Sequence, residues 1–343
     1  MSLRSRLGQL AGISHPRRRR RPIRLAHDVE TLESRVLLAG NVAAVVDDGT
    51  LTIRGDAESN SVQVTVTVDG VIVRGIDGTT VNGSADDFVA FAGEVEIGED
   101  LKLKMGHGDD VVLVDAGLSI AGDVRFQGGK GDDRIGFDGV ALGGDAQIKG
   151  SRGDDGVLLD GTTVSGDVRV KAGRGMNAVF AVDSTITGDL KIRTGADADA
   201  IHLDNTSIGE DLRVHTRQAD DGLYVEESTV GGKLRVAAGR GDDFTMIEAS
   251  TISGTARVKL RHGDDAFVVT GATAFEDSVM LNGGRGEDAQ DVADDTVLAE
   301  PITVRRFEFD DVTGPVIVEK LDAPDSGIRT RSNELRDFFV ALV

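Results

Sequence analysis

A unit of about 22 residues recurs through most of this 343-residue chain, and it constrains the fold more than any other feature. Each unit contains a Gly-rich turn such as Gly106-His107-Gly108-Asp109-Asp110. The place that Asp109 holds in this turn recurs at residues 132, 154, 176, 198, 220, 242, 264 and 287, so successive units are 22 or 23 residues apart. Such regular spacing indicates stacked structural repeats rather than a globular core.

Apolar residues occupy fixed columns within the repeat and alternate with polar ones. Val112 and Val114 follow one turn, and Ile135 and Phe137 hold the same places after the next. Alternation is typical of strands, and a unit this short cannot bury its apolar face unless it stacks on its neighbours. We therefore predict an all-β, right-handed parallel β-helix of 22-residue coils, with about nine turns, over residues 96–295.

The segments on either side of the repeat have different patterns. Residues 42–95 alternate with period two, as in Val62, Val64 and Val66, and Asp69-Gly70 marks a hairpin turn. We expect a β-hairpin module that closes the N-terminal end. Because a solenoid end exposes unpaired strand edges, residues 296–343 are expected to form a C-terminal cap.

Residues 1–41 are expected to form an Arg-rich segment outside the fold. Residues 1–35 carry nine Arg and three acidic residues, a net charge of +6, whereas the whole chain carries −21, so the remainder carries −27. Such an acidic body repels nucleic acid and anionic membranes. The chain contains no run of 18 apolar residues, so it has no predicted transmembrane segment. The absence of Cys excludes disulfides and thiolate metal sites.

Within this segment, residues 32–38 read Leu-Glu-Ser-Arg-Val-Leu-Leu. They resemble the LEPR-XLL motif, an N-terminal sorting segment of large bacterial surface proteins, with Ser34 where the motif has Pro. The resemblance implies a bacterial protein that is secreted or displayed at the cell surface. A disordered basic tail is the alternative.

The Gly/Asp turns are candidate calcium sites. Residues 128–135 read Gly-Gly-Lys-Gly-Asp-Asp-Arg-Ile and resemble the GGxGxDx nonapeptide of RTX repeats, and residues 283–288 repeat its first six positions. The resemblance implies that calcium binds along this edge. The ligands that it implies are Asp133 and Asp288, with Asp110, Asp155, Asp243 and Asp265 in looser copies.

The alternative is that these Asp residues only close turns. Carboxylates one coil apart, about 4.8 Å, repel by roughly 0.9 kcal/mol in water and about 3.5 kcal/mol at an effective dielectric constant of 20. The row therefore requires cations, splayed side chains or protonation. Oxygen ligands favour Ca²⁺ over zinc or iron, and the sequence leaves calcium binding and turn closure both open.

Two further rows of charged residues run along the coils. One is acidic and follows the first strand, at Asp115, Asp138, Asp160, Asp204, Glu226 and Glu248. The other is basic and lies on the last strand, at Lys102, Arg125, Arg169, Lys191, Arg213, Arg235 and Arg257. We interpret both as solvated edges, although the basic row is also suited to an acidic glycan.

No catalytic apparatus is evident in this sequence. Insertions never exceed one residue per coil, which argues against the long loops that form the cleft of β-helix enzymes. The sequence therefore predicts a non-catalytic structural or adhesive β-solenoid at the cell surface, with calcium and possible glycan or matrix-protein partners. A β-helix polysaccharide lyase or epimerase acting on acidic glycans is the alternative.

Overall fold

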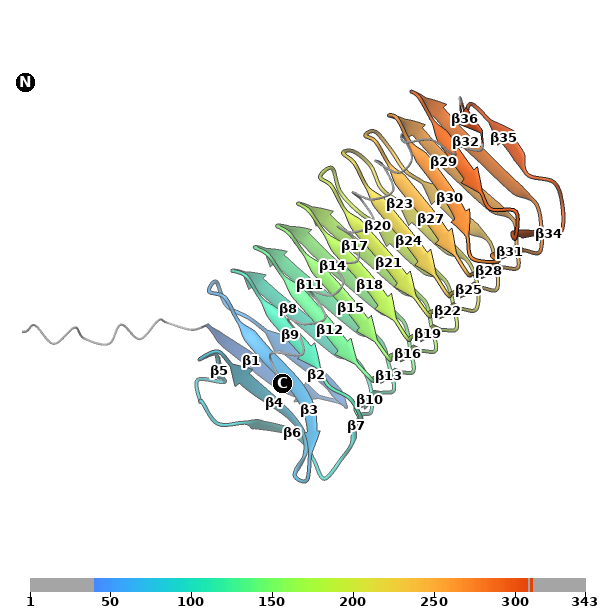
Figure 1. Ribbon diagram of the computed structural model, residues 1–343. Coiled ribbons are helices and arrows are strands. Elements are labelled where there is room, and N and C mark those ends of the chain that lie inside the picture. Colours follow the sequence, from blue (N-terminus) through green and yellow to red (C-terminus); the bar gives the residue numbers. More distant parts are fainter. Residues whose placement is uncertain (1–39, 308, 311–343) are drawn as a thin grey trace, which may run out of the picture. The chain divides into compact units, whose positions relative to one another are not determined.

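The computed structural model describes residues 40–307 and 309–310, which belong to one compact unit. All 36 described strands lie in three sheets that form the walls of a parallel β-solenoid (Figure 1). Each coil contributes one strand to each wall, in the order wall 1, wall 2 and wall 3 along the chain. The predicted all-β solenoid is therefore confirmed, and ten stacked strands in wall 2 show about ten turns.

Wall 1 contains the strand that follows each Gly/Asp turn. Its members are β3 (Ser61–Thr67), β4 (Gly70–Ile76), β6 (Phe88–Ala92), β9 (Val111–Val114), β12 (Arg134–Asp138), β15 (Gly156–Asp160), β18 (Ala178–Val182), β21 (Ala200–Asp204), β24 (Gly222–Glu226), β27 (Phe244–Glu248), β30 (Ala266–Thr270), β33 (Ala289–Val292) and β36 (Phe309–Asp310).

Wall 2 contains only two-residue strands. They are β7 (Glu96–Ile97), β10 (Ser119–Ile120), β13 (Ala141–Leu142), β16 (Thr163–Val164), β19 (Thr185–Ile186), β22 (Ser207–Ile208), β25 (Thr229–Val230), β28 (Thr251–Ile252), β31 (Ala274–Phe275) and β34 (Val297–Leu298).

Wall 3 contains the last strand of each coil. Its members are β1 (Asn41–Asp47), β2 (Thr50–Arg54), β5 (Thr80–Val81), β8 (Leu101–His107), β11 (Val124–Lys130), β14 (Ala146–Arg152), β17 (Val168–Arg174), β20 (Leu190–Arg193), β23 (Leu212–His215), β26 (Leu234–Ala237), β29 (Ala256–His262), β32 (Val279–Arg285) and β35 (Thr303–Arg305).

The interior is filled by the apolar columns that the sequence predicts. In β17, Val168 and Val170 are 0% and 1% exposed, while Arg169 between them points outward. The register keeps the columns aligned, since Val168 pairs with Ala146 on one side and with Leu190 on the other. Stacking therefore places like residues above one another along the whole described length.

The N-terminal module joins the walls directly. Its β3–β4 hairpin is present, but the two-residue loop is Val68-Asp69, and Gly70 already pairs with Thr67. This differs from the expected Asp69-Gly70 turn, because Gly70 alone of that pair has a positive φ, at 117°. Strands β2 and β3 then pair in parallel with β8 and β9, so the module continues walls 3 and 1.

The C-terminal stretch continues the solenoid as far as it is described. Strands β34, β35 and β36 pair in parallel with β31, β32 and β33, which adds one more coil after the regular repeat. The remainder of the predicted cap, and the sorting segment predicted at residues 1–41 apart from residues 40 and 41, lie outside the described residues. In the part of the chain that the structure describes, no helix is long and apolar enough to cross a membrane.

Wall 1 also carries apolar side chains on its outer face. Strand residues point alternately to opposite faces, so Phe180 and Tyr224, each next to an interior residue, point away from the interior. Both are 0% exposed. They belong to a second apolar cluster, separate from the interior, that contains Val111, Leu113, Leu158, Phe180, Ala200, Tyr224, Phe244, Ala266 and Val268.

Candidate functional site

The Gly/Asp turns place one buried polar residue per coil immediately before wall 1. We call this row the buried ladder. All of its members are at most 4% exposed, although eight of the nine are carboxylic acids. They are Asp110, Asp133, Asp155, Asn177, Asp199, Asp221, Asp243, Asp265 and Asp288.

Each ladder side chain bonds the backbone of the neighbouring coil. The backbone N–H of Asp110 donates to Oδ1 of Asp133 at 3.1 Å, and that of Asp133 donates to Oδ1 of Asp155 at 3.0 Å. The same bond recurs at every later step and ends at Oδ1 of Asp288. The row begins one coil earlier than the sequence indicated, because Asn60 donates its backbone N–H to Asp110 at 2.8 Å.

Glycine makes room for the second carboxylate oxygen. A Cβ on Gly128 would lie 2.2 Å from Oδ2 of Asp133, and one on Gly150 would lie 2.1 Å from Oδ2 of Asp155. Such contacts are too close for any other residue, which explains the Gly that precedes these turns. The Oδ2 atoms of Asp133 and Asp155 make no hydrogen bond with the described residues.

Burial makes these carboxylic acids weak. It raises the pKa of Asp133 and of Asp221 to about 8, with the neighbouring carboxylates adding to the effect. The pKa of Asp265 is raised to about 8 and that of Asp155 to about 7 by the same cause. Protonation at neutral pH therefore supplies one of the ways in which a stacked row of carboxylates avoids repulsion.

The described side chains alone do not make a calcium site. Ca²⁺ takes six to eight oxygen ligands, whereas each coil offers one buried carboxylate whose Oδ1 already accepts a backbone N–H. Among the described residues, no group of three or more His, Cys, Asp or Glu converges. Calcium binding by Asp110, Asp133, Asp155, Asp243, Asp265 and Asp288 stays a prediction, and the geometry favours closure of the turns between coils.

A second ladder of aspartates, which the sequence analysis missed, lies at the corner between walls 2 and 3. Oδ1 of Asp145 accepts the backbone N–H of Asp167 at 2.9 Å, and Oδ1 of Asp167 accepts that of Asp189 at 2.9 Å. The row comprises Asp100, Asp123, Asp145, Asp167, Asp189 and Asp211. We call it the corner ladder.

The basic row of wall 3 is paired with this corner ladder. Arg169 bridges Asp145 and Asp167 at 3.2 and 2.6 Å, and Lys191 reaches Asp189 at 2.7 Å. Partial burial raises the pKa of Asp189, but Lys191, Arg213 and the backbone N–H of Asp211 together lower it to about 2. Lys102, Arg125, Arg213 and Arg235 make corresponding pairs. Most of the row is therefore occupied within the protein.

The acidic row that follows the first strand of each coil lies at or just after the ends of the wall 1 strands. Gln63 donates to Asp115 at 2.7 Å, and the Tyr224 hydroxyl donates to Glu248 at 2.6 Å. Its remaining members are Asp138, Asp160, Asp204 and Glu226. The structure aligns them in one row, which Val182 interrupts between Asp160 and Asp204.

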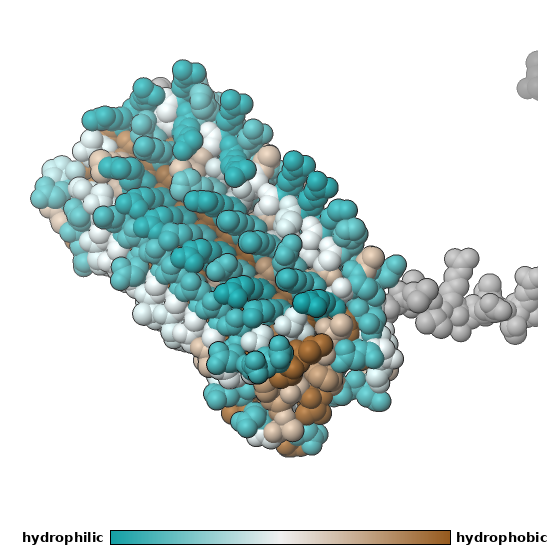
Figure 2. Space-filling model, turned by 180° about the vertical axis from the view of Figure 1, so that it is seen from behind, coloured by the Kyte–Doolittle hydropathy of each residue, from teal (hydrophilic) through white to brown (hydrophobic). Residues whose placement is uncertain are grey.

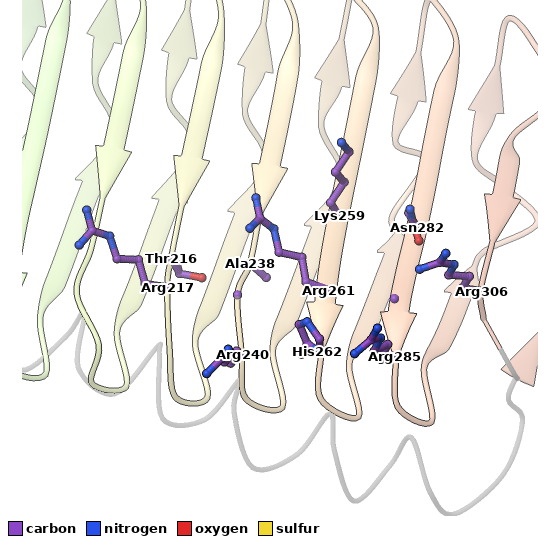
Figure 3. A pocket seen from close by; sticks show the side chains of 12 residues that line it. Thr216, Arg217, Ala238, Arg240, Lys259, Arg261, His262, Asn282, Arg285 and Arg306 are labelled. Atoms are coloured by element: carbon purple, nitrogen blue, oxygen red, sulfur yellow. The ribbon is translucent and has the colours of Figure 1, made fainter.

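A cavity of about 600 Å³ lies elsewhere, on wall 3 and the turn after it (Figure 3). Its charged lining consists of Arg217, Arg240, Lys259, Arg261, His262, Arg285 and Arg306. We call it the basic groove. The sequence analysis did not recognise these residues as a group.

Comparisons of this chain with protein-family models, with curated proteins and with solved structures found no match.

The raised pKa values of the buried ladder predict a solenoid that is more stable at mildly acidic than at alkaline pH. In the unfolded chain these aspartates release their protons above their ordinary pKa of 3.8, whereas in the folded chain they hold them until about pH 8. The free energy of unfolding therefore falls as the pH rises from about 4 to about 8. Urea unfolding at pH 5, 7 and 9 measures this. Asp133→Asn removes the charge and keeps an acceptor, as Asn177 does naturally, so it should gain at least about 1 kcal/mol at pH 9.

Asp133→Ala is the matched control, because it leaves the N–H of Asp110 unpaired and should lose about 1–3 kcal/mol at every pH.

Repeating the urea unfolding with calcium, magnesium or chelator tests the calcium prediction. Calcium at 100 times its dissociation constant adds about 2.7 kcal/mol per site, and Asp133→Asn with Asp155→Asn would weaken the calcium response, because four of the six predicted ligands remain. Stability that increases from pH 5 to pH 9 without added metal would contradict the assigned protonation.

Proposed function

We propose that this chain is a non-catalytic structural and adhesive β-solenoid that is secreted or displayed at the bacterial cell surface. The observation that carries the proposal is the continuous locking of one coil to the next through the buried ladder. From Asn60 to Asp288, every step of this row is closed by a side-chain to backbone hydrogen bond. Such a ladder suits a stable spacer or display surface.

The walls support the same role. The strands from β8 to β33 in walls 1 and 3 pair in parallel on both sides, without inserted loops between rungs. Exposed edges are therefore confined to the ends, which limits unwanted edge pairing. Wall 3 presents charged side chains to solvent, and Figure 2 shows hydrophilic rows along one face of the solenoid.

The surface destination rests on residues 32–38, whose resemblance to the sorting motif is independent of the fold. Extracellular proteins that lack disulfides require another source of rigidity. The paired walls and ladders supply it here, since the chain has no Cys. The polysaccharide lyase or epimerase alternative is tested by assaying the purified chain on uronic-acid polymers.

The surface role predicts that protease added to intact producing cells will reach the full-length chain. A variant with Glu33→Ala and Arg35→Ala should be retained inside and protected, because these residues form the polar part of the sorting motif. The control is Arg18→Ala with Arg20→Ala, which lies outside the motif and should be exported normally. Immunoblotting before and after cell lysis measures accessibility, and a parent chain found wholly inside intact cells would contradict the proposal.

A further inference from the structure

The basic groove gathers cations from five successive coils of an otherwise acidic protein. Arg217, Arg240, Arg261, Arg285 and Arg306 each come from a different coil. Figure 3 shows Arg240, His262 and Arg285 near the turn, with Lys259 farther along wall 3. Coils stack about 4.8 Å apart, so positive groups repeat along the groove at that interval.

The five groove arginines differ from most of the basic row in having no acidic partner. Six members of the basic row bind the corner ladder, and only Arg257 does not. Within the described residues, none of the five groove arginines forms an ion pair. The groove therefore carries positive charge that no described acidic side chain neutralises.

Backbone strain at Arg261 is a second, independent observation. Its φ is 92°, in a region that L side chains rarely adopt. Glycine holds the equivalent position in most coils, as at Gly106, Gly129 and Gly173, and Ser151 holds it in one coil with a φ of 108°. The neighbouring coils have Gly239 and Gly284 here, which leaves the groove hollow around the Arg261 side chain. Arg261 thus places a long cation where the backbone favours glycine, at a local cost in strain.

The electrostatics of a nearby side chain agree with this view. Burial lowers the pKa of His215, and the positive charges of Arg193 and Arg261 lower it further. The region around Arg261 therefore has a positive potential before any ligand binds. An anion in the groove would relieve it.

We propose that the basic groove binds an acidic polysaccharide with one carboxylate per sugar. Guanidinium groups bind carboxylates through paired hydrogen bonds, and a sugar chain lying along the groove would present its charges to successive coils. The groove lining contains no Phe, Tyr or Trp, so it lacks the stacking platforms of single-stranded nucleic acid sites. This inference rests on the proposed adhesive function and gives that adhesion a ligand class.

The test is calorimetric binding of a uronic-acid oligosaccharide to the full chain at low ionic strength. A neutral oligosaccharide of equal length, inorganic phosphate and single-stranded DNA are the competing probes. We expect the uronate oligomer to bind most tightly and to weaken as salt is added. Arg261→Gly restores the glycine of the column, so it should raise the unfolding midpoint while weakening binding about tenfold.

Arg169→Gln is the matched control, because Arg169 is already paired with two aspartates and Gln147 holds the same place one coil earlier. It should bind like the parent. Absence of uronate binding, or unchanged binding by Arg261→Gly, would overturn the groove assignment. Tighter binding of DNA would overturn the ligand class. Each result leaves surface display, measured separately, unaffected.

Discussion

The rest of the structure depends on one interaction, the hydrogen bond from a backbone N–H of one coil to an aspartate Oδ1 of the next. Each coil has three corners, and at each corner the backbone N–H groups no longer pair with a neighbouring strand. A buried N–H without a partner costs about 1–3 kcal/mol. Repeated in every coil, that cost would exceed the stability of an ordinary domain.

Each corner has its own row of side chains that prevents this cost. The buried ladder closes the corner between walls 3 and 1, and the corner ladder closes the one between walls 2 and 3. At the third corner, hydroxyl groups act instead, as where the N–H of Thr206 donates to Ser228 at 3.0 Å. These Ser and Thr residues are therefore structural, and in the central coils side chains close the turns at more than one corner.

The two aspartate ladders also show how environment sets acidity. Asp133 is enclosed, and its pKa is raised to about 8 by burial. Asp189 is reached by Lys191 and Arg213, and its pKa is lowered to about 2. The first ladder avoids repulsion by holding protons and the second by binding cations.

The sequence predicted the solenoid because strand alternation and a constant spacing are properties of the chain itself. Alternation places Val168 and Arg169 on opposite faces, and in the structure Val168 is buried while Arg169 points outward. Alternation could not predict which backbone N–H each ladder aspartate would accept. An Asp in a turn can bond its own backbone or that of the next coil, and only the stacking distinguishes them.

The corner ladder and the basic groove were missed for a related reason. Asp145 and Asp167 each follow a Gly and resemble ordinary turn residues, and their role emerges only when Arg169 is seen to lie between them. Arg261 was likewise hidden, because its significance depends on the glycines above and below it. The aligned sequence did place Arg261 between two glycines, but only the backbone angles of the structure show that this position favours glycine.

The most direct test of the account is a carbon NMR titration of the aspartate carboxyl groups in the metal-free folded chain. The account predicts that Asp133, Asp221 and Asp265 titrate near pH 8, while Asp189 titrates near pH 2. Ladder carboxyl groups that are fully ionised by pH 5 would contradict it, because a buried row of charged aspartates would then require bound cations to exist.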